Sequence, residues 1–260
     1  MAALRLEEIN PRKTVSEKVT PAPLRQALKQ IFSDIPEGLW LVGGTALAGY
    51  YAEHRRSDDL DLFAGDPDTH QATVLSVKRL KKIGAIFEKE KSTPNFYKGH
   101  LQLKGHSFTV DVVLDENLHQ VGRSTKTEDG VRVVALPTIF AMKAACLLSR
   151  CSEKDLYDLA WCFDQTGEID VAQLVEKGSL VDGGMNVEGM LISLQGAVLR
   201  KDACHFLLDD SNKAVDEAYR KIADLQKRLI HVLLDYERGQ PLSQETKALA
   251  DAVKDQKKIR

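Results

Sequence analysis

"LVGGTALAGYYAEHRRSDDLDLF", residues 41–63, joins an apolar run, a glycine pair, a helical segment and an acidic segment. The apolar run 39–42 predicts a buried strand that ends in a turn at residues 43–44, and residues 45–54 have helical character. Residues 59–63 alternate between polar and apolar side chains, which predicts a second strand. The position of the acidic residues in this second strand therefore needs an explanation, because a sheet usually buries apolar side chains.

Strand periodicity decides what the acidic residues of this segment can do. Asp59 and Asp61 are two residues apart, so they point to one face of the strand, while Leu60 and Leu62 point to the other. Two carboxylates held side by side repel each other unless a cation lies between them or one of them takes up a proton. Carboxylate oxygens suit Mg²⁺ or Mn²⁺ better than zinc. The pattern therefore predicts half of a divalent-metal site.

A later strand offers a third carboxylate. Asp111 lies between apolar residues in the strand-like run 108–114, and a lone acid among apolar side chains is costly to bury without a partner. We expect Asp111 to complete the metal site. The alternative is an aspartate on an edge strand that faces water.

The glycine pair predicts a phosphate-binding turn. A strand that ends in Gly43 and Gly44, before a helix that begins at Thr45, directs backbone N–H groups at one point, where phosphate oxygens bind well. Alone, this sequence is also an ordinary turn with a helix N-cap. The acidic strand follows one helix later, so we expect the phosphate turn and the carboxylates at the ends of neighbouring strands.

The rest of the chain divides by its periodicity. Strand-like runs dominate its middle third, with a hairpin expected at Lys104 and Gly105, and only helical patterns follow Pro137, the last of them at 244–257. This order predicts an α/β core with a mixed sheet, followed by an all-helical part. The expected domains are an N-terminal arm (1–22), the α/β core (23–135) and a C-terminal helical domain (136–260).

Composition limits the possible classes of protein. The chain of 260 residues has 36 basic and 38 acidic side chains, so a formal net charge of −2 argues neither for nor against a nucleic-acid partner. Its four cysteines lack Cys-x-x-Cys spacing, which favours buried side chains in a reducing compartment. The N-terminus does not resemble a signal peptide and no run of 18 apolar residues occurs. We therefore expect a cytoplasmic protein that does not bind membranes.

Three motifs together resemble those of the polymerase-β-type nucleotidyltransferase superfamily. They are Val-Gly-Gly at 42–44, Asp-Leu-Asp-Leu at 59–62 and Val-Asp-Val at 110–112. The chain more closely resembles the AbiEii/AbiGii toxin family of bacterial abortive-infection and toxin–antitoxin systems, with its MenT-like nucleotidyltransferases. The motifs that carry this closer resemblance are Gly-Gly-Thr-Ala-Leu at 43–47 and His-Arg-Arg-Ser-Asp-Asp-Leu-Asp-Leu at 54–62.

A second block of sequence extends the resemblance. The family has a helix with a lysine, an arginine some seven residues later and then an acid-rich helix start. Here these correspond to Lys143 and Arg150, and to the segment Lys154-Asp155-Leu156-Tyr157-Asp158-Leu159. The motifs span residues 42–160.

The resemblance implies roles for individual residues. Asp59 and Asp61 would be metal ligands, Ser57 would lie at the nucleotide phosphates and Lys143 would contact the triphosphate. Asp155, or alternatively Asp158, would be the late functional acid. The assignment of Asp111 as a metal ligand and orienting acid comes from the broader superfamily.

Each of several basic residues has two possible roles. Arg150 would bind the nucleotide, or it would form a structural ion pair with Asp155. Lys143 would otherwise be a surface lysine whose charged end extends into water. Arg55 and Arg56 would contact phosphate or RNA, or would balance the acids that follow them.

The function implied by the resemblance is Mg²⁺-dependent (or Mn²⁺-dependent) transfer of NMP from an NTP to an RNA acceptor. The expected acceptor is the 3′ end of tRNA, whose modification would stop translation, and a cognate antitoxin protein is the expected partner. The basic stretches 213–228 and 254–260 would hold RNA, or would be solvated helix surface. Alternatives are a small-molecule nucleotidyltransferase of the antibiotic-modifying type and a non-catalytic member of the same fold.

Overall fold

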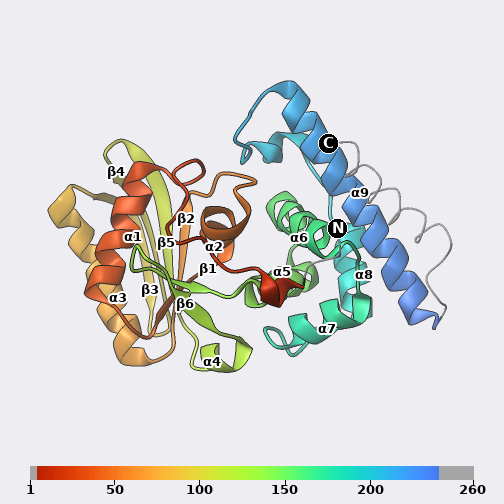
Figure 1. The fold of residues 1–260 in the computed structure, drawn as a ribbon, viewed down its shortest axis with the longest axis horizontal. Coiled ribbons are helices and arrows are strands. Elements are labelled where there is room, and N and C mark those ends of the chain that lie inside the picture. Colours follow the sequence, from red (N-terminus) through yellow and green to blue (C-terminus); the bar gives the residue numbers. More distant parts are fainter. Residues whose placement is uncertain (1–4, 240–260) are drawn as a thin grey trace. The chain divides into compact units, whose positions relative to one another are not determined.

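The computed structural model describes residues 5–239 and has a mixed α/β fold (Figure 1). Contacts divide the chain into two compact units, Ile9–Ile139 and Phe140–Arg260 together with Met1–Glu8. All strands of the described chain belong to the first unit, and the second unit is helical. The predicted fold class, a mixed sheet followed by a helical C-terminal part, is therefore confirmed. The predicted helix at 244–257 and the basic stretch at 254–260 lie outside the described residues.

A seven-stranded mixed sheet forms the first unit, in the order β3-β4-β5-β2-β1-β7-β6. The strands are β1 (Leu39–Val42), β2 (Asp59–Ala64), β3 (Ile86–Thr93), β4 (Phe96–Leu103), β5 (His106–Leu114), β6 (Ser124–Lys126) and β7 (Arg132–Val134). β2 pairs antiparallel with β1 and parallel with β5, and β5 pairs antiparallel with β4. β2 and β5 are therefore neighbours in the interior of the sheet, although β3 and β4 lie between them in sequence.

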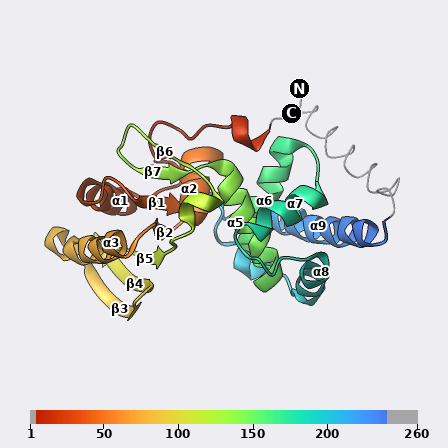
Figure 2. The same cartoon turned by 90° about the horizontal axis from the view of Figure 1, so that it is seen from below.

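Two helices cover one face of this sheet. α1 (Ala22–Asp34) and α3 (Pro67–Arg79) pack against each other, and α3 packs on β2 and β5 (Figures 1 and 2). The strand side chains on this face are apolar and fully buried: Leu60, Leu62, Val110 and Val112. Burial of each such side chain contributes about 1.5–3 kcal/mol. A shift of β2 by one residue would place its aspartates under the helices, so the apolar residues fix which way the aspartates point.

The β4–β5 hairpin closes with the predicted two-residue turn. Lys104 and Gly105 have φ angles of 50° and 80°. Positive φ at both positions is the pattern of a type I′ turn, whose twist matches that of the two strands. The turn sets the register of β4 on β5, and the sequence prediction of this hairpin is confirmed.

The segment from the glycine pair onward differs from the predicted turn at 43–44 and single helix at 45–54, because the helix already begins at Gly43. It forms α2 (Gly43–Leu47) and then a π-helix, η2 (Ala48–Ala52). A π-helix inside a helical segment changes the backbone hydrogen-bond pattern and often occurs near functional sites.

Residues 9–22, predicted as an arm, belong to the first unit and bind to this π-helix. The backbone N–H groups of Arg12 and Ser16 donate to the carbonyls of Tyr50 and Gly49, each at 2.8 Å. The carboxylate of Glu53 accepts further hydrogen bonds from the side chains of Arg12 and Ser16. The N-terminal segment therefore holds the element that follows the glycine pair.

Five longer helices account for most of the remaining chain. They are α5 (Leu136–Ser149), α6 (Glu153–Thr166), α7 (Val171–Ser179), α8 (Val187–Gly196) and α9 (Asn212–Glu237). The side chains of Ser152, Asp170, Asn186 and Ser211 cap the N-termini of the last four. α9 packs on α6 and α8 through an apolar stripe of helical spacing that includes Ile222, Leu225 and Leu229.

The short elements are η1 (Leu6–Glu8), η3 (Leu80–Ile83), α4 (Leu118–Val121) and η4 (Lys201–Cys204). No helix among the described residues is both long enough and apolar enough to span a membrane.

Candidate active site

The three predicted metal ligands lie on adjacent strands of the first unit. Asp61 of β2 is directly opposite Asp111 of β5, and Asp59 is directly opposite Thr109. Residues opposite each other in neighbouring strands project from the same side of a sheet. All three aspartates are half-buried on the face opposite α1 and α3. The expectation that Asp59 and Asp61 share one face of a strand is therefore confirmed.

Hydrogen bonds orient two of these carboxylates. The hydroxyl of Thr109 donates to Oδ1 of Asp59. The ammonium of Lys98 on β4 lies 2.8 Å from Oδ2 of Asp111, which it faces in register. β5 lies between β4 and β2, so the alternative in which Asp111 faces water from an edge strand is wrong.

The donor chemistry of these strands fits a hard divalent cation. Oδ1 of Asp111 is buried and has no hydrogen-bond partner among the described residues, an arrangement that costs free energy and that either a bound cation or a hydroxyl donor would relieve. Across residues 5–239, no three acidic, histidine or cysteine side chains converge closely enough to form a metal site by themselves. The carboxylates can thus supply ligands, and a nucleotide would have to supply others.

Gly43 and Gly44 allow side chains to approach the backbone closely. Gly43 has a φ of +68°, and a Cβ atom on it would lie 2.0 Å from Oδ2 of Asp61. A Cβ atom on Gly44 would lie 2.6 Å from Nη2 of Arg55 and 3.0 Å from Oγ of Ser57. The turn therefore packs directly against an aspartate, an arginine and a serine of the predicted site.

Thr45 ties the start of α2 to the acidic strand. Its side chain is fully buried, donates to the backbone carbonyl of Asp59 and lies 2.9 Å from the hydroxyl of Ser57. The hydroxyl of Thr45 is thus used within the protein, which leaves its backbone N–H as the group that the predicted phosphate contact would use. Ser57 itself is 5% exposed.

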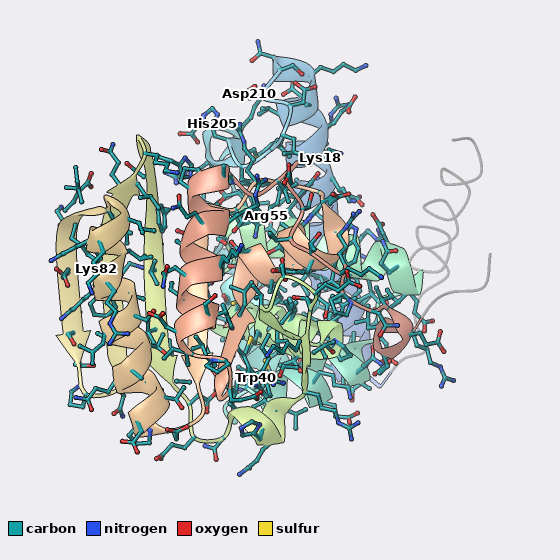
Figure 3. The ribbon with its side chains drawn as sticks, turned by 60° about the vertical axis from the view of Figure 1, so that its left-hand side comes forward. Lys18, Trp40, Arg55, Lys82, His205 and Asp210 are labelled. Atoms are coloured by element: carbon teal, nitrogen blue, oxygen red, sulfur yellow. The ribbon has the colours of Figure 1, made fainter. Side chains whose placement is uncertain are left out.

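Arg55 is a candidate site residue that the sequence suggested only together with Arg56 and with two interpretations. Its side chain is only 2% exposed and lies beside the start of α2 (Figure 3). Its Nη1 donates to the carbonyl of Arg56 at 2.9 Å. A buried guanidinium beside Gly44 and Ser57 has the charge and the donors that bind phosphate. The adjacent Arg55 and Arg56 gave a signal in the sequence, but only the fold shows which of them is buried.

A second charged cluster lies in the helical unit. The ammonium of Lys143 on α5 is 2.8 Å from Oδ1 of Asp155 and 2.8 Å from Oδ2 of Asp158. The three residues are 7%, 1% and 0% exposed. Lys143 is therefore not a surface lysine, and both candidates for the late acid bind it.

Asp155 is the centre of this cluster. Its Oδ2 accepts a hydrogen bond of 2.6 Å from the hydroxyl of Ser152 and lies 3.2 Å from Nε of Arg150. Burial by itself raises the pKa of the Asp155 carboxyl, but the charge and hydrogen bond of Lys143, with Ser152 and Arg150, bring this pKa below its usual value. The ion pair of Arg150 with Asp155 exists, which leaves its use by a nucleotide as a prediction.

The predicted residues thus form two groups. The first unit brings together the glycine turn, Ser57 and the three aspartates, and the second unit brings together Lys143, Arg150 and Asp155. A cavity of about 460 Å³ in the second unit contains none of them. Its lining includes Arg5, Phe140, Phe163, Glu168 and Asp170.

The family of the chain follows from a comparison with family models. The model of the nucleotidyltransferase AbiEii toxin, type IV toxin–antitoxin system, matches residues 26–228. The chain belongs to the AbiEii toxin family. This AbiEii protein is therefore a nucleotidyltransferase of the toxin–antitoxin type, and the matched region contains every residue of both groups.

A comparison with solved structures finds a protein with a similar fold. MenT4, a nucleotidyltransferase toxin from Mycobacterium tuberculosis H37Rv, is 17% identical with a TM-score of 0.50, over 87% of this chain and 88% of MenT4. JHP933 from Helicobacter pylori is 16% identical with a TM-score of 0.48, over 82% of this chain and 93% of its own. At this identity, the likeness to MenT4 shows a shared fold. A search of curated proteins gives no match.

Proposed function

We propose that the AbiEii protein transfers NMP from an NTP to an RNA acceptor, the 3′ end of tRNA, in an Mg²⁺-dependent reaction. The observation that carries this proposal is the register of β2 on β5, in which Asp61 faces Asp111 while Asp59 projects from the same face. Carboxylates gathered next to a glycine turn suit a triphosphate that arrives with its divalent ion.

Asp59 and Asp61 would hold the ion in this proposal. Mg²⁺, when bound, would stabilise the negative charge on the α-phosphate and on the departing pyrophosphate. The hydroxyl of Thr109 orients Asp59, and Asp61 packs against the backbone of Gly43. Both carboxylates are thus directed before any ligand arrives, which lowers the cost of ordering them on binding.

The glycine turn would bind the phosphates that leave as pyrophosphate. Gly43 and Gly44 have no Cβ, so phosphate oxygens can reach the backbone N–H groups of the turn and of Thr45. The hydroxyl of Ser57 and the buried guanidinium of Arg55 lie next to Gly44 and add donors.

Asp111 would act on the acceptor. Its Oδ1, which has no hydrogen-bond partner in the described chain, would accept the proton of the acceptor hydroxyl. The hydroxyl oxygen then forms a bond to the α-phosphorus, and the bond from that phosphorus to the pyrophosphate oxygen breaks. Lys98 binds the other oxygen of Asp111 and keeps the carboxylate in one orientation.

The helical unit would contribute to nucleotide binding through its cations. We propose that Lys143 and Arg150 bind the triphosphate and that Asp155, which contacts both, positions them. The side chain of Arg150 is 68% exposed, so its removal should leave the fold intact. An Arg150→Gln enzyme should have a higher KM for NTP and an unchanged thermal unfolding midpoint, and an unchanged KM would remove Arg150 from the nucleotide site.

Modification of the 3′ end of tRNA would prevent its aminoacylation and stop translation. Such an activity harms the cell that makes it, so a cognate antitoxin is the expected partner, in line with the toxin–antitoxin family.

Labelling of total tRNA tests the proposal. Purified protein is incubated with Mg²⁺, each α-³²P-labelled NTP in turn and total tRNA. The wild type should label tRNA, while Asp59→Asn should reduce labelling by a factor on the order of 10²–10³ and excess EDTA should abolish it. Asp58→Asn, one position earlier and 49% exposed, is the matched control and should keep it.

Two results would overturn the RNA assignment. One is the absence of label in RNA with every NTP. The other is label that enters a small hydroxyl compound such as an aminoglycoside and not RNA, which would support the antibiotic-modifying alternative.

A further inference from the structure

The face of the sheet that carries the aspartates continues onto β4 and β3 with the opposite charge. Pairing registers place Asp61 opposite Asp111, Asp111 opposite Lys98 and Lys98 opposite Lys91. These four residues form one row across four strands. The row begins with two acids and ends with two lysines.

A second row runs beside the first. Asp59 is opposite Thr109, Thr109 is opposite His100 and His100 is opposite Lys89. It changes from acidic to basic in the same direction. We call Lys89, Lys91, Lys98 and His100 the basic strip.

Strand periodicity sorts the charges of β3 between the two faces. β3 contains the sequence Glu88-Lys89-Glu90-Lys91, and Glu90 points to the side of α3, where it accepts a hydrogen bond of 3.0 Å from the hydroxyl of Tyr97. Lys78 of α3 and Lys81 of η3 also lie 3.9 Å from Glu90. An irregularity between Phe87 and Lys89 then places both lysines of β3 on the face of the aspartates. Lys89 and Lys91 therefore project from the face of the aspartates, and Glu90 projects from the opposite face.

Two lysines of the strip, Lys89 and Lys91, differ from three cations of α9, a helix that the sequence suggested for RNA. Three cations of α9 have acidic partners: Lys213 with Glu217, Lys221 with Asp164 and Arg228 with Asp224. Lys89 and Lys91 are exposed, and no acid pairs with either of them within the part of the chain that the structure describes. Lysines without a paired acid attract phosphate more strongly, since no internal ion pair has to break.

We propose that the basic strip binds the sugar–phosphate backbone of the RNA acceptor and leads its 3′ end to the aspartates. The inference rests on the proposed function and adds the place where the acceptor strand lies. Lys91 and Asp61 are three strand spacings apart, roughly 14 Å, a distance that a short single strand can span.

An aromatic ring lies within this surface. Phe96 of β4 is half-buried, projects from the same face as Lys98 and pairs with Val113 of β5. Rings placed among basic side chains stack on the bases of single-stranded RNA. Phe96 therefore provides a stacking position beside the phosphate contacts.

Steady-state labelling with varied tRNA concentration tests the strip. In the Lys89→Glu/Lys91→Glu protein, the KM for tRNA should rise about tenfold or more, whereas the KM for NTP should stay within about twofold of the wild type. The neutral pair Lys89→Gln/Lys91→Gln should show a smaller rise in the same direction and guards against misfolding of β3. Loss of two phosphate contacts should also reduce the slope of log KM for tRNA against log salt by about 1.4.

The matched control is Lys29→Glu/Lys82→Glu, which changes the net charge equally. Both lysines are exposed and lie in helical elements, Lys29 in α1 and Lys82 in η3. Figure 3 shows Lys82. This pair should leave the KM for tRNA unchanged, so that a rise seen only with Lys89 and Lys91 reports their face of the sheet and not the total charge.

The outcomes separate this inference from the proposed function. A wild type that labels no RNA refutes both. A wild type that labels tRNA, with an unchanged KM for tRNA in both β3 variants, refutes the strip alone. If the β3 variants instead lose only the binding of an acidic protein partner, the strip belongs to that partner and the inference is wrong.

Discussion

The two charged clusters of this AbiEii-family protein differ in their exposure to solvent. Asp59, Asp61 and Asp111 on the sheet are half-buried, whereas Asp155 and Asp158 on α6 are sealed from solvent around Lys143. Oδ1 of Asp111 has no hydrogen-bond partner in the described chain, while the oxygens of Asp155 are engaged by Lys143, Ser152 and Arg150. The carboxylates of the sheet can exchange ligands, whereas the buried ion pairs of Lys143 also hold α5 and α6 together, in addition to the nucleotide binding proposed for this cluster. The two clusters should therefore respond differently to equivalent substitutions.

The largest effect should come from a substitution at the sheet. Asp59→Asn should reduce tRNA labelling by a factor on the order of 10²–10³, because it removes an oriented charge from the site of reaction. The thermal unfolding midpoint should change little, as the side chain is half-exposed. Equal loss of activity and of stability would show that Asp59 is structural and would remove the contrast between the clusters.

The second-largest effect should be a loss of stability in the helical unit. Asp158→Asn leaves a buried lysine with one carboxylate fewer, and breaking a buried ion pair costs about 3–5 kcal/mol. Urea unfolding followed by the fluorescence of Trp161 on α6, in a Trp40→Phe background, measures the change close to the cluster. Glu217→Gln, in an exposed pair on α9, should have little effect. A loss with Asp158→Asn no larger than with Glu217→Gln would contradict the structural role.

A smaller effect should follow from Gly43→Ala. Positive φ at a residue with a Cβ costs about 1–3 kcal/mol, and here the Cβ would also meet Asp61. Gly84→Ala is the matched control, because Gly84 has a φ of +95° and open space around it. Both variants should lose stability, but only Gly43→Ala should also lose tRNA labelling. Equal labelling by the two variants would show that the turn at Gly43 does not take part in the active site.

The smallest effect should be on the pH dependence of stability, to which Asp155 of the buried cluster contributes. The pKa of the Asp155 carboxyl is lower in the folded protein than the ordinary 3.8, so the folded state binds this proton less tightly than the unfolded state. Its contribution to stability is present above pH 3.8 and is lost as the pH falls through the folded pKa. Asp155→Asn should therefore flatten the acid side of the stability profile in urea unfolding from pH 7 to pH 3. An unchanged slope would contradict the assignment.

Much of the fold could be predicted from the sequence, because the spacing of apolar residues and the turn residues indicate strands and hairpins locally. The period of two in residues 59–63 correctly placed Asp59 and Asp61 on one face, and the Lys104-Gly105 turn correctly predicted the β4–β5 hairpin. The π-helix η2 was not predicted, since its carbonyls bind to a distant segment, residues 9–22. The short elements β6 and α4 also carry too few residues for a periodic signal.

Site geometry depended on contacts between distant parts of the sequence. The sequence suggested Asp111 as a candidate but could not show that it faces Asp61 in register or that Lys98 binds it. It paired Arg150 with Asp155 as one option, yet the two aspartates around Lys143 require the packing of α5 on α6. Burial of Arg55 likewise depends on the fold of the glycine turn around it. Contacts between residues far apart in the sequence produce no local pattern from which they could be predicted.

The parallel pairing of β2 with β5 also sets the order in which parts of the sheet can form during synthesis. Thr109 and Asp59, which share a hydrogen bond, are 50 residues apart, and the β3–β4 segment between them has to emerge from the ribosome first. At a synthesis rate of about 5–20 residues per second, the two strands become available about 3–10 seconds apart. A nascent toxin therefore passes through a period in which its acidic strand is made but its site is incomplete. During that interval the chain carries Asp59 without β5, whose Thr109 orients this carboxylate in the folded protein.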